Sequence, residues 1–515
     1  MKAIFWLAAS IWLAINVMTL TGYPAVWVDE ILSADPGIHL ALGKGFVSAA
    51  WFNQPSWEFW ASYPPLYAFA LAGWLKLFGI SAFVVRSFGL TLVTASLLMI
   101  GLTLRRLGLD ARWLILAALA VGEPLAFLER AGRPDSVSVF LLAATGLVFV
   151  SQEWRWRAAG LFLFGALAVP AALQYAAYVL LLGFLLQLWF RPFARKDVAL
   201  WLAGVACGSA SLALIYVSHG VLRIFVESTL ASKHSSAGRL LQQMFLKNGS
   251  LPFVFSDILT APLRDYATPI LLLAGFIVWL TIPATRKLSS FGVVCAILIP
   301  LAIQLLGKYP IYYTYMAFIP AAIAIMAACR MPAARGAVVA LLLVGGAGHL
   351  WWKAFTQGSE NLAVSVSSSD SVVADYPAYY QLLGRTRELF AVGYAGGKVM
   401  PHFPPEQASR ITKILVRESM FGDVAKKVGG SWRKVSAAKV TIDDDTRLGY
   451  QELLGIYVRS DTNPRGANRR GHTQSIPTAS RNIAEGSGML TALSPNIFGA
   501  SEFNTVTCPV SGLMP

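Results

Sequence analysis

The sequence contains few charged residues for its length. Only 13% of its 515 residues are Asp, Glu, Lys or Arg, whereas about a quarter is usual in soluble domains. Hydrophobic residues make up 56%, and apolar runs of about 20 residues recur, which excludes an ordinary soluble protein. No basic stripe with interleaved aromatic residues occurs, so the net charge of +15 does not indicate nucleic-acid binding. Glycine motifs for phosphates or dinucleotides are absent, as are internal repeats.

Cysteine is also scarce. The chain has four cysteines, at positions 207, 295, 329 and 508, and their spacing forms neither a disulfide framework nor a zinc motif. At the N-terminus, one Lys precedes an apolar stretch from Ala3 to Leu20 that has no convincing cleavage site. We therefore expect a retained first membrane span rather than a removed signal peptide.

The apolar runs predict the membrane topology. They cover residues 3–21, 64–80, 83–104, 112–129, 134–151, 157–170, 173–190, 197–218, 265–282, 290–306, 310–328 and 335–353. If all crossed the membrane, the basic clusters would alternate between its two faces. If 64–80 does not cross, these clusters share one face: 105–112, 155–157, 191–196, 286–287 and 330–335. The positive-inside rule makes that face cytoplasmic. We therefore predict an all-α polytopic membrane protein with eleven spans and a cytoplasmic N-terminus.

In this topology the run 64–80 is an interfacial or re-entrant helix, which protein or a water-filled cavity must cover. The runs 157–170 and 173–190 are expected as shorter, tilted helices around Pro170. Outside the cytoplasm lie the first loop, 22–82, the tip 129–135, and the loop 219–263. Any chemistry is therefore expected on the external face.

The composition changes after the last apolar run. Residues 1–353 are predicted to form the catalytic membrane domain. Residues 354–460 are more polar and are predicted to form a small external α/β domain, with a helix at 379–390. Residues 461–515 are rich in Asn, Ser, Thr, Gly and Pro without periodicity, which is typical of a disordered tail.

Two adjacent carboxylates, Asp29 and Glu30, follow the first predicted span on its external side. Such a pair at a membrane boundary is a candidate general base or metal-ligand pair. Asp at a helix start with Glu in the first turn also suits helix capping and the helix dipole. The two interpretations are compatible, because a capping Asp can still face a cavity.

Further along the first external loop lie His39, Tyr63 and Tyr67, all candidates for a substrate cavity. Pro64-Pro65 between the tyrosines forces an extended backbone into the following helix, which a simple turn also explains. His39 equally fits a surface or packing residue of an external helix.

Other charges stand at the external edges of the predicted spans. Arg133 and Asp135 bracket the start of a span, and we expect them to pair, because a carboxylate at the edge of the apolar slab is costly without a partner. Lys308 can either snorkel or bind a lipid phosphate as a point charge. The tyrosines near it, Tyr312 among them, fit an interfacial belt or the cavity.

The loop 219–263 is longer than a connection requires, which favours a functional loop. It contains several cationic candidates for phosphate binding, including His234 and Arg239.

The order of these motifs resembles the GT-C superfamily of polyprenyl-phosphate-sugar-dependent glycosyltransferases. Within it, the likeness is greatest to the protein O-mannosyltransferase and lipid A aminoarabinose transferase branch. It covers roughly residues 1–353. The matching segments are Asp29-Glu30; Pro64-Pro65-Leu66-Tyr67 leading to Leu77-Phe78-Gly79 and Arg86; Arg133-Pro134-Asp135-Ser136; and Lys308 before a Tyr-rich run that ends at Pro320.

The resemblance implies transfer of a sugar from a polyprenyl-phosphate donor, with Asp29 as the catalytic carboxylate and Glu30 supporting it. It also implies that Lys308 and residues of the loop 219–263 hold the donor phosphate. Transfer needs a base and positive charge for the departing phosphate, and Arg133 is another candidate for that charge. A divalent metal could replace the cation, although the sequence offers few ligands for one. No other cofactor is expected.

One segment departs from the pattern. The aminoarabinose transferases have Glu-Lys before Pro-Pro, where this chain has Ser62-Tyr63. A direct contact to the donor phosphate at this point is therefore lost or moved, and the resemblance does not extend to the identity of the sugar.

The expected partners are membrane lipids, the polyprenyl-phosphate sugar and an acceptor. An envelope glycolipid such as lipopolysaccharide, or a polymer, is favoured because the external domain is small; a protein acceptor is the alternative. A transporter or flippase of lipid-linked sugars belongs to a different class. It would place charges near the midplane and show repeated halves, which this chain does not. A catalytically silent subunit is the third possibility, and the presence of both Asp29 and Glu30 argues against it. We expect the protein in the inner membrane with its active face on the periplasmic side.

Overall fold

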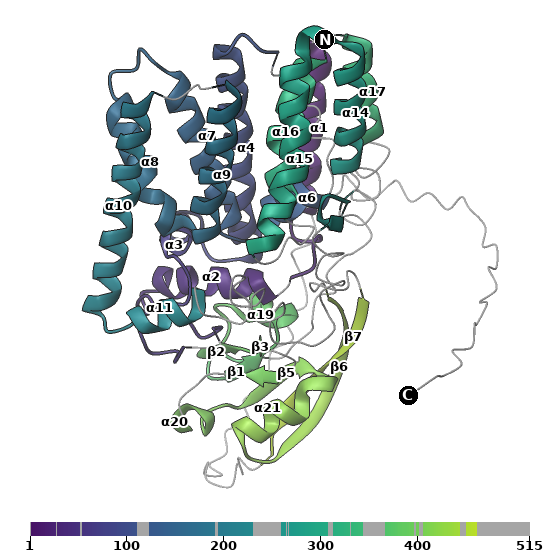
Figure 1. Cartoon of the computed structure of the whole chain (residues 1–515). Helices are drawn as coiled ribbons and strands as arrows, with labels where there is room; N and C mark the ends of the chain where they lie inside the picture. Colours follow the sequence, from purple (N-terminus) through teal and green to yellow (C-terminus); the bar gives the residue numbers. More distant parts are fainter. Residues whose placement is uncertain are drawn as a thin grey trace, which may run out of the picture. The chain divides into compact units, whose positions relative to one another are not determined.

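The structure is a computed structural model (Figure 1). It describes residues 2–26, 28–51, 54–110, 123–190, 194–229, 259–263, 265, 267–306, 313–329, 331–342, 366–395, 398–400, 405–442 and 450–460. The described residues up to 462 belong to one compact unit, and the second unit, Asn463–Pro515, lies outside them, as does the predicted tail.

Helices occupy most of the described part before residue 343, and the described part of each predicted apolar run overlaps one; residues 112–122 and 343–353 of these runs lie outside the described residues. The bounds are α1 Lys2–Thr19, α2 Val28–Ala41, α3 Leu66–Phe78, α4 Ala82–Arg106, α6 Glu123–Arg130, α7 Asp135–Val150, α8 Arg157–Ala171, α9 Leu173–Phe190, α10 Arg195–Ser218, α11 Leu222–Thr229, α14 Ala267–Thr281, α15 Arg286–Leu306, α16 Tyr315–Ala328 and α17 Pro332–Leu342. Helix α8 ends at Ala171, and Ala172 has an extended backbone before α9 begins. The interruption lies close to Pro170, where it was expected.

Three segments among the described residues are long and apolar enough to cross a membrane, namely 82–106, 195–218 and 283–304. Further apolar helices there are shorter, and α3 has 13 residues, about 20 Å of helix. These helices support a membrane-embedded protein. The count of eleven spans, the non-crossing role of 64–80 and the cytoplasmic N-terminus remain predictions.

Several of the predicted basic clusters meet at the same end of the helices. Arg157 at the start of α8 forms an ion pair of 2.6 Å with Asp197 in the first turn of α10. Arg106 at the end of α4 contacts the Ser151 hydroxyl just after α7. These contacts join α4 to the end of α7, and α8 to the start of α10. They lie at the end of the helices that is opposite α2 and α3 (Figure 1).

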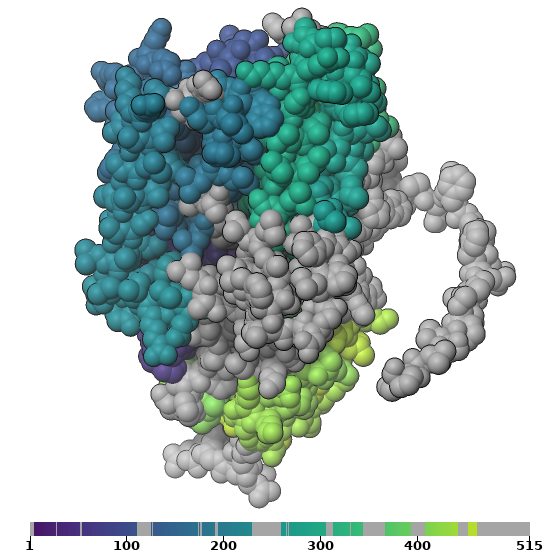
Figure 2. Space-filling model, viewed as in Figure 1, coloured from purple at the N-terminus to yellow at the C-terminus, as the bar shows by residue number. Residues whose placement is uncertain are grey.

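Helices α8 and α10 cross at unusually close range because glycines face the partner backbone. A Cβ added at Gly208 would lie 1.9 Å from the Ala166 carbonyl oxygen, and one at Gly204 would lie 2.1 Å from that of Phe162. Small residues of this kind allow membrane helices to approach closely. On the other side, α10 forms the edge of the described surface (Figure 2), where Leu214 is 69% exposed, as a lipid-facing side chain would be.

Strands and short helices occupy the described residues from 371 to 459. The bounds are β1 Ser371–Ala374, α19 Tyr376–Leu382, β2 Glu388–Ala391, β3 Gly393–Ala395, β4 Lys398–Met400, α20 Pro405–Ala408, β5 Lys413–Arg417, α21 Phe421–Val428, β6 Trp432–Ile442 and β7 Tyr450–Arg459. The main sheet has the order β2-β1-β5-β7-β6, with β1 parallel to β2 and β5, and β7 antiparallel to β5 and β6.

The prediction of a helix at 379–390 is only partly correct. Its first residues belong to α19, which ends at Leu382, and its last residues form β2. Gly384, with φ +72°, follows the helix, and such a backbone favours glycine over other residues. The chain is then free to pair in parallel with β1.

In the strands β1 and β5 both faces are buried, although successive side chains in a strand point to opposite sides. In β1 and β5, Val373 and Ile414 pack toward Val424 of α21. Their neighbours Val372 and Leu415 belong instead to a core shared with α2. The sheet is therefore joined to α2, the helix that begins with the candidate catalytic carboxylates.

Candidate active site

The predicted carboxylate Asp29 lies in the first turn of α2 and contacts an arginine from the tip before α7. Arg133 Nη1 lies 2.6 Å from Asp29 Oδ2, and Arg133 Nε lies 2.8 Å from Asp135 Oδ2. The predicted Arg133–Asp135 pair is thus present, and the same guanidinium also binds Asp29. The Asp29 side chain is 38% exposed, whereas those of Arg133 and Asp135 are each 8% exposed.

Two tyrosines before and at the start of α16 complete this cluster. The Arg133 guanidinium lies 5.8 Å from the centre of the Tyr313 ring, and its Nη2 lies 3.4 Å from the Tyr313 hydroxyl oxygen. Tyr315 donates a hydrogen bond of 3.4 Å to Asp135 Oδ1. Asp29 of α2, Asp135 of α7 and Tyr313 before α16 therefore meet around one guanidinium.

Glu30 has a different environment from its neighbour Asp29. Its two carboxylate oxygens accept hydrogen bonds of 2.8 and 2.7 Å from Arg86 of α4, and both side chains are fully buried. Arg86 Nη1 also donates to the carbonyl oxygens of Leu20 and Pro24, just after α1. Glu30 thus helps fix the start of α2 to α4 and α1.

The tip that carries Arg133 is held against the same helices. Arg130 is fully buried and donates to Asn16 Oδ1 at 2.8 Å and to the Tyr23 carbonyl oxygen at 2.9 Å. Gly132 has φ +55°, and a Cβ there would lie 3.0 Å from Cγ of Glu30. Glycine is needed at this point because both the backbone and the close approach disfavour a side chain.

A second carboxylate of α2, Asp35, is fully buried and links the helix to the sheet region. Its Oδ2 accepts a hydrogen bond of 2.6 Å from the Ser48 hydroxyl and one of 2.8 Å from the Ala49 amide. Its Oδ1 accepts one from the hydroxyl of Tyr379 in α19. The same oxygen lies 3.2 Å from Nδ1 of His39, which places the predicted cavity residue His39 in this contact.

The pKa values of Asp35 and His39 are shifted from their ordinary values in opposite directions. Burial alone would raise the pKa of Asp35, but the charge of His39 and the hydrogen bonds from His39, Ser48 and Tyr379 bring it below its ordinary value. Burial alone would lower the pKa of His39, but the carboxylate of Asp35 raises it above its ordinary value. The contact is therefore an ion pair at mildly acidic pH.

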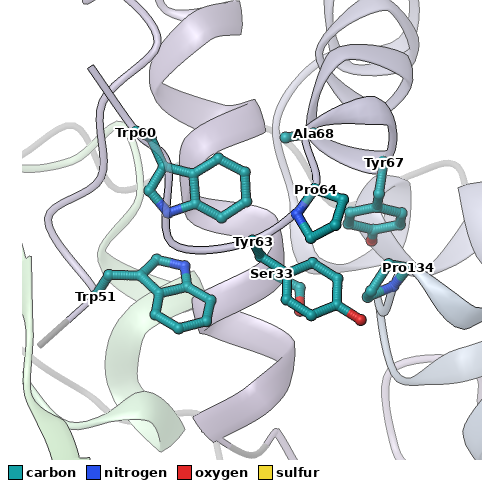
Figure 3. A pocket seen from close by; sticks show the side chains of 8 residues that line it. All are labelled: Ser33, Trp51, Trp60, Tyr63, Pro64, Tyr67, Ala68 and Pro134. Atoms are coloured by element: carbon teal, nitrogen blue, oxygen red, sulfur yellow. The ribbon is translucent and has the colours of Figure 1, made fainter. Parts of the chain in front are cut away.

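Tyr63 and Tyr67, the other predicted cavity residues of the first loop, line a narrow aromatic pocket (Figure 3). Its remaining lining residues are Ser33, Trp51, Trp60, Pro64, Ala68 and Pro134. Ser33 lies one helical turn after Asp29, and Pro134 stands between Arg133 and Asp135. The pocket therefore adjoins the Arg133 cluster.

Four predicted residues, Lys308, His234, Arg239 and Tyr312, lie outside the described residues. The same holds for most of the loop 219–263. Within the described part, no group of three or more His, Cys, Asp or Glu side chains is arranged to hold a metal ion.

The sequence reasoning missed several residues of the site. Tyr313 is one of the tyrosines near Lys308, for which the sequence predicts only a belt or the cavity, and Arg86 is only part of a motif. Asp35 has no predicted role, because no local pattern marks its contacts with Ser48, Ala49 and Tyr379. The one available signal was the group of tyrosines after Lys308, which indicated an external position but not the contact with Arg133.

Comparisons with known proteins identify the fold. No family model matches the chain, and no curated protein matches it. The structure of ArnT from Cupriavidus metallidurans bound to undecaprenyl phosphate superposes with a TM-score of 0.52 at 13% identity, over 88% of this chain and 98% of ArnT. Its apo state gives a TM-score of 0.44 with the same identity and coverage. This chain therefore shares the fold of ArnT.

Proposed function

We propose that this protein is a membrane glycosyltransferase that transfers a sugar from a polyprenyl-phosphate donor to an acceptor on the external side of the membrane. The observation that carries the proposal is the Asp29–Arg133–Asp135 cluster, where a partly exposed carboxylate meets a guanidinium suited to phosphate. The shared fold adds support, because the matching ArnT structure is bound to undecaprenyl phosphate.

The reaction is a single displacement. The acceptor hydroxyl oxygen attacks the anomeric carbon of the donor sugar, and the bond from that carbon to the phosphate oxygen breaks. The electron pair of that bond leaves with the polyprenyl phosphate. Asp29 takes the proton of the acceptor hydroxyl as general base. Attack opposite the leaving phosphate inverts the anomeric configuration.

Arg133 has two tasks in this scheme. Without donor it neutralises Asp29 at 2.6 Å. The donor phosphate competes for the same guanidinium, since Arg binds phosphate as it binds carboxylate. Donor binding then releases Asp29 to accept a proton and places positive charge beside the leaving group. Asp135 keeps Arg133 oriented through its contact at Nε. Lys308, His234 and Arg239 remain predicted additional phosphate ligands.

Glu30 acts as a positioning residue in this proposal. Its bidentate contact with buried Arg86 fixes the first turn of α2, and so the backbone that carries Asp29. The proposed acceptor is an envelope glycolipid or polymer, and the proposed location is the inner membrane with the site facing the periplasm.

The test is sugar transfer by the full chain in lipid nanodiscs. Radiolabelled polyprenyl-phosphate sugars serve as donors, with an envelope extract as the acceptor source. Asp29→Asn is expected to lower the transfer rate at least about a hundredfold, as expected for loss of a general base. The matched control is Asp197→Asn. Asp197 also lies in the first turn of a helix and pairs with an arginine, but at the other end of the helices.

The outcomes separate the possibilities. If Asp29→Asn transfers sugar as fast as the native protein, Asp29 is only a helix-capping residue. If the native protein binds the donor but transfers no sugar to any acceptor fraction, the enzyme proposal fails and carriage of the lipid becomes the better explanation.

A further inference from the structure

The segment 313–316, where α16 begins, supplies two of the contacts around the shared guanidinium. Tyr313 lies against Arg133, and the hydroxyl of Tyr315 donates a hydrogen bond to Asp135. The other two residues of the segment are bound by side chains from α9 and from just before α14. The position of these four residues therefore determines whether the two tyrosines reach the cluster.

Thr314 precedes the first turn of α16, and it is fully buried. A threonine at this point in a chain often accepts a hydrogen bond from an amide in the first turn of its own helix. Thr314 makes no such bond, and its backbone is already helical, with φ −63° and ψ −22°. Its hydroxyl donates instead to the carboxylate of Asp265. The side chain thus joins α16 to another helix.

Asp265 uses the same carboxylate to hold the start of α14. Its Oδ1 accepts a hydrogen bond of 2.7 Å from the amide of Thr268, and its Oδ2 accepts one of 2.9 Å from the Thr268 hydroxyl. Asp265 is buried, so these donors replace the water that the carboxylate loses. One carboxylate therefore fixes the starts of both α14 and α16.

A second contact fixes the first turn of α16 at Met316. In an α-helix the carbonyl oxygen of Met316 would accept from the amide four residues later, but that residue is Pro320, which has no N–H. The hydroxyl of Tyr178 in α9 donates to this oxygen at 2.8 Å. The start of α16 is therefore anchored to α9 as well as to the end of α14.

We propose that Thr314 is a positioning residue for the donor phosphate, because its bond to Asp265 keeps the start of α16 in place beside Arg133. The inference rests on the proposed function for the role of Arg133 as a phosphate ligand. The contacts of Tyr313 and Tyr315 with the cluster each measure 3.4 Å, longer than most hydrogen bonds. A small shift of the segment would break them and leave the guanidinium less well oriented.

The test compares two threonines that donate to the same carboxylate. Thr314→Val and Thr268→Val each remove one hydroxyl from Asp265 and keep the branched shape of the side chain. In Thr268→Val the backbone amide still holds the carboxylate in place. The full chain in nanodiscs is titrated with labelled undecaprenyl phosphate, so that the measurement does not depend on turnover. Tm and the rate of sugar transfer are measured on the same samples.

The two variants are expected to lower Tm to a similar extent, because each leaves the buried carboxylate one donor short. Thr314→Val should weaken binding of undecaprenyl phosphate about fivefold to tenfold, whereas Thr268→Val should change it by less than about twofold. The kcat/KM for sugar transfer should follow the same order. Thr314→Ser keeps the hydroxyl and should bind the lipid within about twofold of the native protein.

A second comparison separates positioning from a general loss of stability. In a protein that already carries Arg133→Lys, Thr314→Val should weaken binding by less than about twofold more, because residues that act through one another are not additive. A merely structural role would give the same loss in both backgrounds.

Three results would overturn the inference: native affinity in Thr314→Val, an equal loss in Thr268→Val, or a full additional loss in the Arg133→Lys background. A native protein that shows the expected pattern of binding but transfers no sugar would refute the proposed function and leave the role of Thr314 standing. One that transfers sugar without a difference between the two valine variants would refute only the role of Thr314.

Discussion

Asp29 and Glu30 are adjacent in the sequence, yet each belongs to an arginine cluster of a different kind. Glu30 and Arg86 are fully buried, and the guanidinium is matched by the carboxylate and two backbone carbonyl oxygens. Asp29 is 38% exposed and shares Arg133 with Asp135. The first cluster can only hold its geometry, whereas the second can exchange a partner for an incoming anion. Burial and the number of partners, rather than residue type, separate Glu30, which has a structural contact, from Asp29, which is proposed to be reactive.

The largest difference between the Glu30 and Asp29 clusters is expected in their contributions to the stability of the fold. Glu30→Gln leaves Arg86 buried without its counter-charge, which should lower the free energy of unfolding by about 3–5 kcal/mol. Asp29→Asn should change it by less than about 1 kcal/mol, because a partly exposed ion pair contributes little. Thermal unfolding of both variants in the same detergent provides the comparison. Equal shifts of Tm would mean that the two clusters are both structural.

The second comparison concerns the arginine that is shared. Arg133→Lys keeps the charge but cannot bridge two acidic groups with a planar fork, so kcat/KM for sugar transfer should fall about tenfold to a hundredfold. Arg157→Lys is the control, since Arg157 binds Asp197 through two hydrogen bonds at the opposite end of the helices. An Arg133→Lys enzyme with native kcat/KM would assign the donor phosphate to other cations.

The smallest effect is expected in the pH dependence of Tm. It arises from Asp35, the buried carboxylate of α2 that contacts His39. The pKa of Asp35 is lowered from 3.8, so its contribution to stability is present above pH 3.8 and is lost as the pH falls through the lowered value. The pKa of His39 is raised from 6.5, so its contribution is present below pH 6.5 and is lost as the pH rises through the raised value. Tm should therefore be highest between these limits. His39→Gln should remove the decline on the alkaline side and, because His39 helps to lower the pKa of Asp35, should also reduce the contribution of Asp35 on the acid side. An unchanged profile would contradict the pairing.

Much of the fold follows from patterns that are local in the sequence. The described part of every predicted apolar run overlaps a helix, because long apolar segments are strong signals. The Arg133–Asp135 pair could also be expected, since its members are two residues apart at the edge of a span. The segment 379–390 was less predictable: its residues suit a helix, but pairing with β1 makes the last of them a strand. Strand formation there depends on a partner that local propensity does not reveal.

The candidate site was predicted in its parts but not in its connections. Asp29, Glu30 and Arg133 were identified by type and position, whereas the contacts Arg133–Asp29 and Arg86–Glu30 join residues from different helices. Tyr67 is predicted in a cavity, but the indoles of Trp51 and Trp60 that line the pocket with it are not part of that prediction. Such features need the three-dimensional arrangement, because they depend on how the loop packs against α3.

The contact between Asp35 and Tyr379 has a consequence for how the protein is made. The two residues are 344 positions apart, whereas Arg86 follows Glu30 by only 56. At about 5–20 residues per second, a ribosome adds Arg86 within seconds and needs tens of seconds more to reach Tyr379. The start of α2 can therefore be fixed early in synthesis, but its second anchor forms only after the sheet region has left the ribosome. Completion of the helix that carries Asp29 is thus a late step of biogenesis, and a chain that stops before residue 379 lacks it.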